Sequence, residues 1–273
     1  MYRLSAVLVM SLAAARGTPA AAQTDDHDDS GPVEVGYAVL TPISPTTGGL
    51  TVFETFGLKT GDDTLQTEVI PGALVTEATL FASTSDRLGR DLGVAFTNPG
   101  NGEARITLML RRDDGILQWT QMLFLQPRHQ TSSFVSQLFA GLIPAEFSGT
   151  LAISSTVPVA ILGLRFRGRT FSTEPLINPV SSGTLPVISA GVGGANAILL
   201  AHFVSGGGWA SEIVIVNTNT TQSNVRVDFF KQDGSPMTVR LNGSARSTFF
   251  NLTFLARGVF TLAPRDSSGD SRF

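Results

Sequence analysis

Apolar and polar residues alternate along two stretches of the chain, and these stretches match one another at a constant offset of 119 residues. Residues 98–115 correspond to 217–234, and both copies close on an acidic-Gly turn. Alternation with a period of two is typical of a half-buried β-strand, so the pattern predicts a duplicated β unit. The matching apolar positions are Val94, Phe96, Ile106, Leu108 and Leu110 in the first copy, and Ile213, Ile215, Val225, Val227 and Phe229 in the second.

Short strands bounded by turn residues account for most of the chain in this interpretation. Their density, about seven per 100 residues, predicts an all-β protein made of two tandem immunoglobulin-like β-sandwiches. Helical periodicity is weak throughout, although 136–142 has room for one turn. The expected strands are 36–41, 49–56 and 64–70; then 78–82, 92–98, 104–112, 117–125, 130–139, 149–155 and 159–167; and finally 198–204, 211–217, 223–231, 237–241, 246–254 and 258–262.

A second, weaker repetition aligns 36–53 with 149–166 at an offset of 113, with Gly36 on Gly149 and Phe53 on Phe166. The C-terminal unit shows no counterpart of 149–167, so it would expose unpaired strand edges. Our hypothesis is that 34–70 folds back to complete 198–262. Two alternatives stay open: 34–70 pairs with 76–140 while 149–176 pairs with 198–262, or the chain is part of a longer array.

The N-terminus has the pattern of a secretory signal peptide. Arg3 precedes an apolar run at 4–15, and an A-x-A site predicts cleavage after Ala22. We therefore expect a secreted or cell-surface protein, with the bacterial periplasm as an alternative, and no membrane span. The predicted divisions are a signal peptide (1–22), a disordered acidic lead-in (23–33), an N-terminal half-repeat forming a β-hairpin (34–75), a central sandwich (76–176), a linker (177–197), a C-terminal sandwich incomplete without 34–70 (198–264) and a disordered tail (265–273).

Composition narrows the chemistry. Cysteine is absent, which excludes disulfides, thiol catalysis and Cys-ligated zinc. Charge is divided unevenly, because 36–148 holds 11 acidic and 7 basic residues whereas 149–262 holds 4 acidic and 8 basic ones. The opposite net charges favour contact between the halves or head-to-tail association of molecules. Independent change of surface residues in the two copies would give the same counts of charged residues.

With these residues in view, the chain resembles a tandem repeat of secreted and surface proteins from environmental bacteria, notably soil bacteria. The resemblance covers nearly all of 34–262 and implies immunoglobulin-type sandwiches within larger extracellular arrays, with no established catalytic role. It rests on turn and core patterns: Gly36-Tyr37-Ala38-Val39, Gly93-Val94-Ala95-Phe96-Thr97-Asn98-Pro99, Phe203, Gly206-Gly207-Gly208-Trp209, Ile213-Val214-Ile215-Val216-Asn217 and Phe229-Phe230 followed by Gly234.

Two features are candidates for ligand binding. Trp209 follows three glycines, and an exposed Trp can stack on a sugar face; the alternative is a bulged strand entry with Trp209 capping the core. Arg165, Arg167 and Arg169 alternate along one predicted strand and so share a face that could hold carboxylates or phosphates of an anionic polymer. A solvated face or a protected edge strand explains the same row.

Catalytic and metal-binding patterns are weak. The acidic run Asp25-Asp26-His27-Asp28-Asp29 lacks the spacing of a calcium loop, and His129 near Ser132 and Ser133 has no accompanying nucleophile motif. We therefore expect no metal, no cofactor, no nucleic-acid partner and no enzymatic activity. The leading hypothesis is a secreted adhesion, structural or interaction module whose partner is an extracellular polysaccharide or surface protein. A carbohydrate-binding module using Trp209 and the arginine row is the alternative, and a hydrolase is a remote one.

Overall fold

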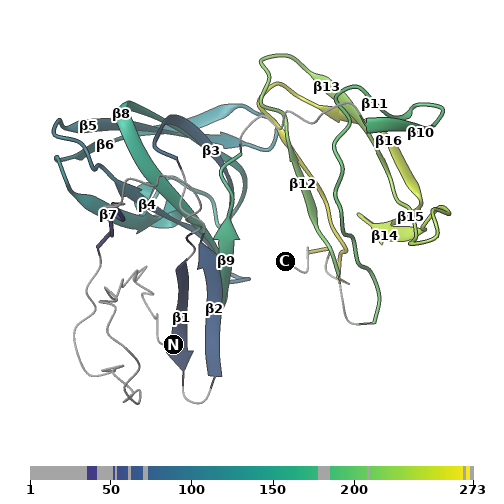
Figure 1. Cartoon of the computed structure of the whole chain (residues 1–273), viewed down its shortest axis with the longest axis horizontal. Coiled ribbons are helices and arrows are strands. Elements are labelled where there is room, and N and C mark those ends of the chain that lie inside the picture. Colours follow the sequence, from purple (N-terminus) through teal and green to yellow (C-terminus); the bar gives the residue numbers. More distant parts are fainter. Residues whose placement is uncertain are drawn as a thin grey trace.

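The computed structural model describes residues 36–41, 52, 54–60, 63–69, 73–177, 185–207, 210–266 and 269–270. Strands dominate these residues, and their one helix is the short α1 (Val135–Leu138), which falls partly within the turn expected at 136–142. The all-β fold class is thus confirmed. The predicted signal peptide and acidic lead-in lie outside the described residues. Figure 1 shows the strands gathered into two units side by side, with the N-terminal hairpin below the first.

The first, central unit contains seven strands. The predicted strands 104–112 and 117–125 are confirmed with their bounds, whereas the predicted strands 149–155 and 159–167 form one continuous strand. The order in the sheet is β6-β5-β8-β3-β4-β7, and β9 also pairs with β8. The strands are β3 (Val75–Ser85), β4 (Arg90–Thr97), β5 (Ala104–Arg112), β6 (Leu117–Leu125), β7 (Gln130–Phe134), β8 (Glu146–Arg167) and β9 (Thr170–Glu174).

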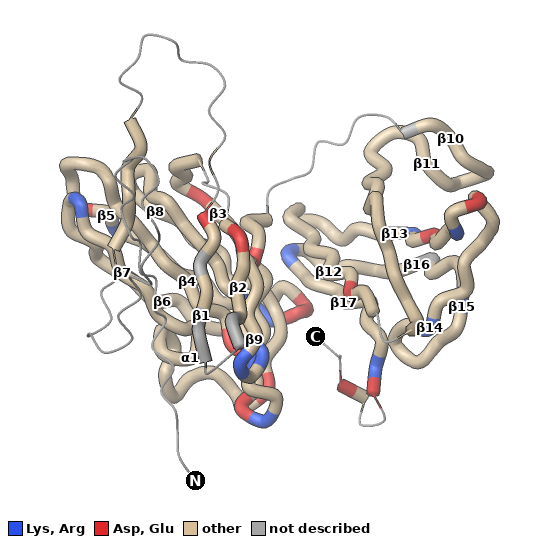
Figure 2. Tube along the Cα trace, turned by 60° about the horizontal axis from the view of Figure 1, so that its bottom comes forward, with Lys and Arg blue, Asp and Glu red and all other residues tan. Residues whose placement is uncertain are grey.

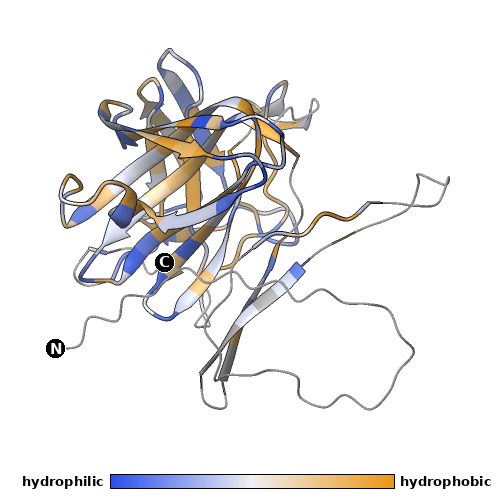
Figure 3. Cartoon of the chain, turned by 90° about the vertical axis from the view of Figure 1, so that its left-hand side faces the viewer, coloured by the Kyte–Doolittle hydropathy of each residue, from blue (hydrophilic) through white to orange (hydrophobic). Residues whose placement is uncertain are grey.

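Strand β8 organises the central unit because it has partners along both edges. Its first half pairs with β3 and β5, and its second half pairs with β4 and β9. The sheet folds over along β8, so that apolar side chains from the two halves meet in one core; Figure 3 shows hydrophobic positions along the facing strands. Leu80, Val94, Ile106 and Leu151 are fully buried there.

The second, C-terminal unit consists of short two-stranded ladders. β10 pairs with β11, β12 with β17, β13 with β16, and β14 with β15. Two expectations are wrong here: the predicted linker 177–197 contains the β10–β11 hairpin, and 198–204 forms no strand. The strands are β10 (Leu185–Ser189), β11 (Val192–Gly194), β12 (Ile213–Val216), β13 (Ser223–Asp228), β14 (Val239–Leu241), β15 (Ser244–Arg246), β16 (Thr248–Phe254) and β17 (Val259–Leu262).

The duplication seen in the sequence is present in the strand pairing. β12 and β13 correspond to β4 and β5 at the offset of 119, because Thr97 pairs with Gln130 while Val216 pairs with Val259. Beyond the acidic-Gly turn the offset becomes 129, so that β16 and β17 correspond to β6 and β7. The ten added residues accompany the β14–β15 hairpin, which supplies Val239 and Leu241 to the second core.

A buried asparagine occupies the same place in both units. The side-chain amide of Asn98 donates to the carbonyls of Gly102, Leu125 and Gln126, at 2.8, 3.0 and 3.2 Å. The side-chain amide of Asn217 donates to the corresponding three carbonyls. Each side-chain oxygen accepts from the backbone N–H two residues later. Each asparagine therefore links the two ends of the strand pair that follows it, β5–β6 or β13–β16. These hydrogen bonds satisfy the buried side-chain amide.

The N-terminal hairpin lies against the central unit. β1 (Glu54–Thr60) pairs with β2 (Asp63–Val69), and β2 lies beside β9, where the Thr173 hydroxyl donates to the carbonyl of Glu68. The hydroxyls of Thr67 and Thr173 are also 3.3 Å apart. Among the described residues, the expected completion of 198–262 by 34–70 does not occur, because β1 and β2 form a separate two-stranded sheet that contacts β9 of the central unit. Residues 36–41, predicted to be a strand, have no regular structure.

Replacing Asn98 by Ala should lower the free energy of unfolding by about 1 to 3 kcal/mol, because the buried carbonyl of Leu125 loses its donor. Urea denaturation followed by circular dichroism measures the change. The exposed Asn101, whose side-chain oxygen accepts from Arg128, provides the control, and its replacement by Ala should change stability by less than about 0.5 kcal/mol. Equal effects of the two substitutions would contradict a structural role for the buried amide.

Candidate functional site

The two units meet through a pair of tight turns. The backbone N–H of Val259 donates to the carbonyl of Asp113 at 2.7 Å. Gly115 has φ of +81°, and a Cβ built on it would lie 1.9 Å from the carbonyl oxygen of Ala256. The acidic-Gly turn of the central unit thus docks on the turn before β17, and only glycine fits the contact.

An ion pair reinforces the contact between the two units, which we call the seam. Arg165, on β8, donates to the Glu212 carboxylate at 2.8 Å, and only 6% of the Glu212 side chain is exposed. The Arg165 guanidinium also lies 5.3 Å from the ring centre of Phe81, a distance suited to a cation–π contact. Figure 2 shows acidic and basic positions of the two units facing one another in this region. A buried carboxylate needs such a partner, so the pair makes the relative placement of the units specific.

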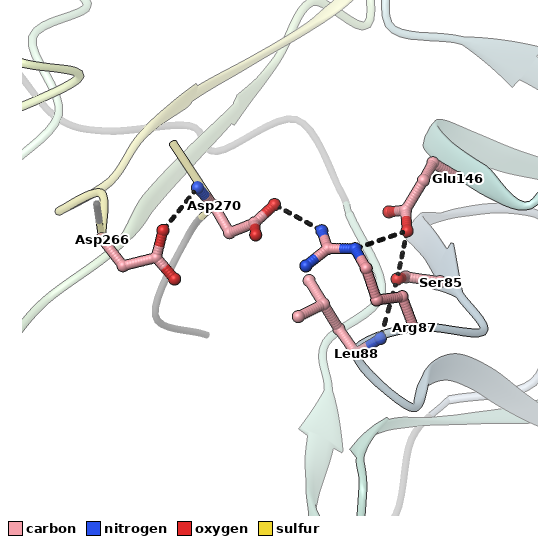
Figure 4. A network of polar contacts seen from close by, with 6 residues as sticks. All are labelled: Ser85, Arg87, Leu88, Glu146, Asp266 and Asp270. Carbon is pink, nitrogen blue, oxygen red and sulfur yellow. Dashed lines mark hydrogen bonds and ion pairs between the residues drawn. The ribbon is translucent and has the colours of Figure 1, made fainter. Parts of the chain in front are cut away.

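A more exposed network joins the units at a third point (Figure 4). Arg87, in the turn before β4, donates to the carboxylate of Asp270 at 2.7 Å and lies 3.7 Å from that of Glu146. This hydrogen bond lowers the pKa of Asp270 below its ordinary value. The backbone N–H of Asp270 in turn donates to Asp266. The described part of the predicted disordered tail is therefore held in contact with the central unit.

A cleft of about 450 Å³ lies between the units, beside these contacts. Phe81, Arg90 and Arg165 line it from the central unit, and Phe260 and Arg265 line it from the second unit. The Arg265 side chain is exposed and donates to the side-chain oxygen of Asn242, which holds it at the wall. A smaller hollow of about 390 Å³ is also lined by Arg165 and Glu212, together with His202.

Burial perturbs two ionisable groups near the cleft. Burial first, and then the positive charges of Arg167 and Arg165, lower the pKa of Arg90 from its ordinary value. Burial raises the pKa of Glu174 to about 7, and Arg165 opposes this effect only in part. Three neighbouring guanidinium groups favour an added anion, and a carboxyl that titrates near neutrality makes the local charge sensitive to pH.

The arrangement is suited to recognition of charged groups. Guanidinium groups bind carboxylates, phosphates and sulfates through paired N–H donors. Glu146, Glu212 and Asp113 also line the cleft, which gives it positions of both signs. Within the described part of the chain, no group of three or more His, Cys, Asp or Glu side chains is placed to hold a metal ion.

The structure divides the predicted arginine row. Arg165 and Arg167 lie on β8, but β8 ends at Arg167, and Arg169 is in the following exposed turn. The expectation of three arginines on one strand face is therefore wrong. Trp209 lies outside the described residues. His129 is exposed in the turn before β7, with its Nδ1 atom 2.9 Å from the carbonyl oxygen of Pro127.

Sequence reasoning did not find the other cleft residues. Arg90, Glu212 and Arg265 are far apart along the chain and lie in no recognisable motif. The available signals were indirect: the opposite net charges of the two halves, and the single arginine row. Neither indicates that the two units meet at the end of β8.

No protein-family model matches the chain, and no curated protein matches it in sequence. One solved structure that aligns with part of it is the crystal structure of Thermotoga maritima 1070, at 12% identity. The alignment covers 37% of this chain and 93% of that chain, with a TM-score of 0.30. A likeness of this size carries no argument, so function has to be inferred from the geometry of the chain itself.

Within the described residues, no helix has the length and apolar content needed to cross a membrane.

Gly115→Ala should open the seam, whereas Gly234→Ala should not. Both glycines have φ of +81°, so the backbone strain is shared, but a Cβ on Gly234 meets nothing within 4 Å. We expect Gly115→Ala to cost at least about 1 kcal/mol more in unfolding free energy than Gly234→Ala. Small-angle X-ray scattering should show a larger radius of gyration for Gly115→Ala alone. Identical scattering for both variants would argue against docking through this turn.

The raised pKa of Glu174 should make stability depend on pH. Glu174 ionises near 4.5 in the unfolded chain and near 7 in the folded one, so the unfolded state holds fewer protons between these values. Stability should therefore fall by about 2 kcal/mol as the pH rises from 4.5 to 7. Glu174→Gln should remove that fall and be the more stable protein at pH 8.

Urea denaturation at several pH values tests this expectation. Glu77→Gln, at an exposed position of β3, is the matched control and should keep the native pH profile. Asp91, whose pKa is also raised by burial, contributes to the profile of every variant. A Glu174→Gln profile parallel to that of the native protein would contradict the assignment.

Proposed function

We propose that the chain is an exported, non-catalytic interaction module that binds an anionic extracellular partner in the cleft between its two units. The observation that carries the proposal is the cleft itself, which is held open by the seam and lined by arginine side chains from both units. The partner is an acidic polysaccharide or an acidic patch of a surface protein. Export and placement at the cell surface, or in the periplasm, are parts of the proposal that the N-terminal sequence supports.

The seam favours binding because it pre-organises the cleft. The units are fastened by the turn at Gly115, by the pair of Arg165 with Glu212, and by the contact of Arg87 with Asp270. Side chains held on such elements lose little conformational freedom when a ligand arrives. A flexible connection alone would leave the two walls of the cleft independent.

The choice of an anion rests on the guanidinium groups. Burial and the positive charges of Arg167 and Arg165 disfavour the charged form of Arg90, and a bound carboxylate or sulfate would add to the opposing effect of Glu212 and Asp270. Arg265 is exposed at the cleft and can add a second donor pair. Phe81 and Phe260 provide apolar surface for the less polar face of a sugar ring or side chain.

The alternative is a carbohydrate-binding module that uses Trp209 together with Arg165, Arg167 and Arg169. The cleft favours a modified version of it, in which Arg165 contributes from the wall and Arg169 takes no part. A hydrolase remains a remote candidate. We further propose that the units are tandem immunoglobulin-like repeats of the kind found in surface proteins of environmental bacteria; the duplicated asparagine, turn and strand pairing support this view.

Binding should be measured with the chain from Gln23 onward against polyuronates, neutral glucans, cell-wall fractions and whole cells, with product release assayed in the same samples. We expect retention of anionic polymers, weakening as salt is raised, without turnover. Arg265→Ala should weaken binding about tenfold, the loss of roughly one charge-assisted hydrogen bond.

Arg169→Ala is the matched control, because it removes an equal charge from an exposed turn outside the cleft. It should leave affinity within about twofold of the native value. Equal binding of neutral and anionic polymers, or equal loss in the two variants, would overturn recognition of an anion in the cleft. Product release that depends on an intact cleft would favour the hydrolase.

A further inference from the structure

The second unit has an open position where the central unit has β8. In the central unit, β4 and β5 each pair with β8 along one edge. Their counterparts β12 and β13 pair only with β17 and β16 among the described strands. Along the edges of β12 and β13 that correspond to the β8 side, the described residues thus form no strand ladder, and an edge without a ladder favours addition of a strand.

Burial differs between the units as expected for a missing strand. Leu80 and Phe81 of β3, a strand that pairs with β8, are 0% and 5% exposed. Their counterparts at the offset of 119, Leu199 and Leu200, are 68% and 55% exposed and belong to no strand. The predicted strand 198–204 is absent because, in the central unit, the equivalent strand depends on β8 for its partner.

Residues 36–41 match the strand that is missing. They align with 149–154, the part of β8 that pairs with β5, and they contain no charged residue. Val39 and Leu40 are 71% and 67% exposed, so this segment also lacks a packing partner. A Cβ on Gly149 would lie 1.9 Å from the carbonyl oxygen of Arg111, so β8 needs glycine there, and the segment has Gly36 at that position.

We propose that residues 36–41 of one molecule add to the edge of β13 that corresponds to the β8 side, in a second copy of the chain, as an antiparallel strand. The pairing of β8 with β5 sets the register, since Leu110 faces Leu151 and Leu108 faces Ile153. Transferred by the two offsets, Ala38 faces Phe229 and Leu40 faces Val227. Thr41 then faces Arg226 on the outer surface of the sheet.

The contacts of the N-terminal region favour a second copy of the chain, rather than the same chain, as the partner of residues 36–41. The hairpin that follows the segment is fastened to β9 of its own central unit, through Thr173 and Glu68. The segment itself is held only lightly there, by an exposed hydrogen bond from the Tyr37 hydroxyl to the carbonyl of Arg128. The acidic first half and basic second half of the chain also favour head-to-tail contact between molecules.

Cysteine cross-linking tests the register, because the chain has no cysteine of its own. Thr41→Cys and Arg226→Cys are made in separate chains, mixed in equal amounts and oxidised gently. Facing residues on paired strands lie within the reach of a disulfide, so a heterodimer should form at least tenfold faster than with the control partner. The control is Thr107→Cys, the counterpart of Arg226 in the central unit, where β8 already occupies the edge.

A second measurement does not depend on cross-linking. The native chain should self-associate as its concentration rises in analytical ultracentrifugation, and Leu40→Asp should weaken that association at least tenfold by placing a charge against the core. Val39→Thr, which changes a side chain on the outer face, should have little effect. A monomer at every concentration, or a chain carrying both cysteines that closes only on itself, would overturn the proposal. Because no polymer is present, the result is independent of the proposed cleft function.

Discussion

Pairing along both edges of β8 is the interaction on which the rest of the structure depends. This strand joins the two halves of the central sheet and gives β3, β4, β5 and β9 their partners. The core forms between those halves because β8 is long enough, at 22 residues, to take part in both. Where its counterpart is absent from the described strands of the second unit, the equivalent strands shorten or disappear and apolar side chains face solvent.

The end of β8 also creates the candidate site. Beyond the core, the strand carries Arg165 and Arg167 out of the apolar region, and β4 places Arg90 opposite Arg167. These charges would be unfavourable together without the Glu212 carboxylate that the second unit brings against them. Arg165 and Glu212 thus both join the units and line the cleft, so the shape of the cleft depends on how the units are placed.

Much of the fold could be predicted from the sequence, because alternation and turn residues act locally. The bounds of β5 and β6 and the duplicated acidic-Gly turn follow from that local pattern. The β10–β11 hairpin was missed because glycines that suggest a linker also permit its tight turn; Gly193 approaches the Pro186 carbonyl too closely for any Cβ. The prediction of a strand at 198–204 is wrong for the opposite reason, since this apolar segment forms a strand only beside a partner strand. The cleft could not be predicted, because Arg90, Arg165 and Arg265 converge only through tertiary contacts.

The unequal ladders of the two units have a mechanical consequence. A folded chain that is pulled through its ends loses first the element with the fewest backbone hydrogen bonds loaded together. In the second unit, β12 is attached to β17 by a ladder of four residue pairs, whereas β8 is held along both edges over most of its length. Under tension we expect the second unit to unfold and extend first, while the central unit stays folded.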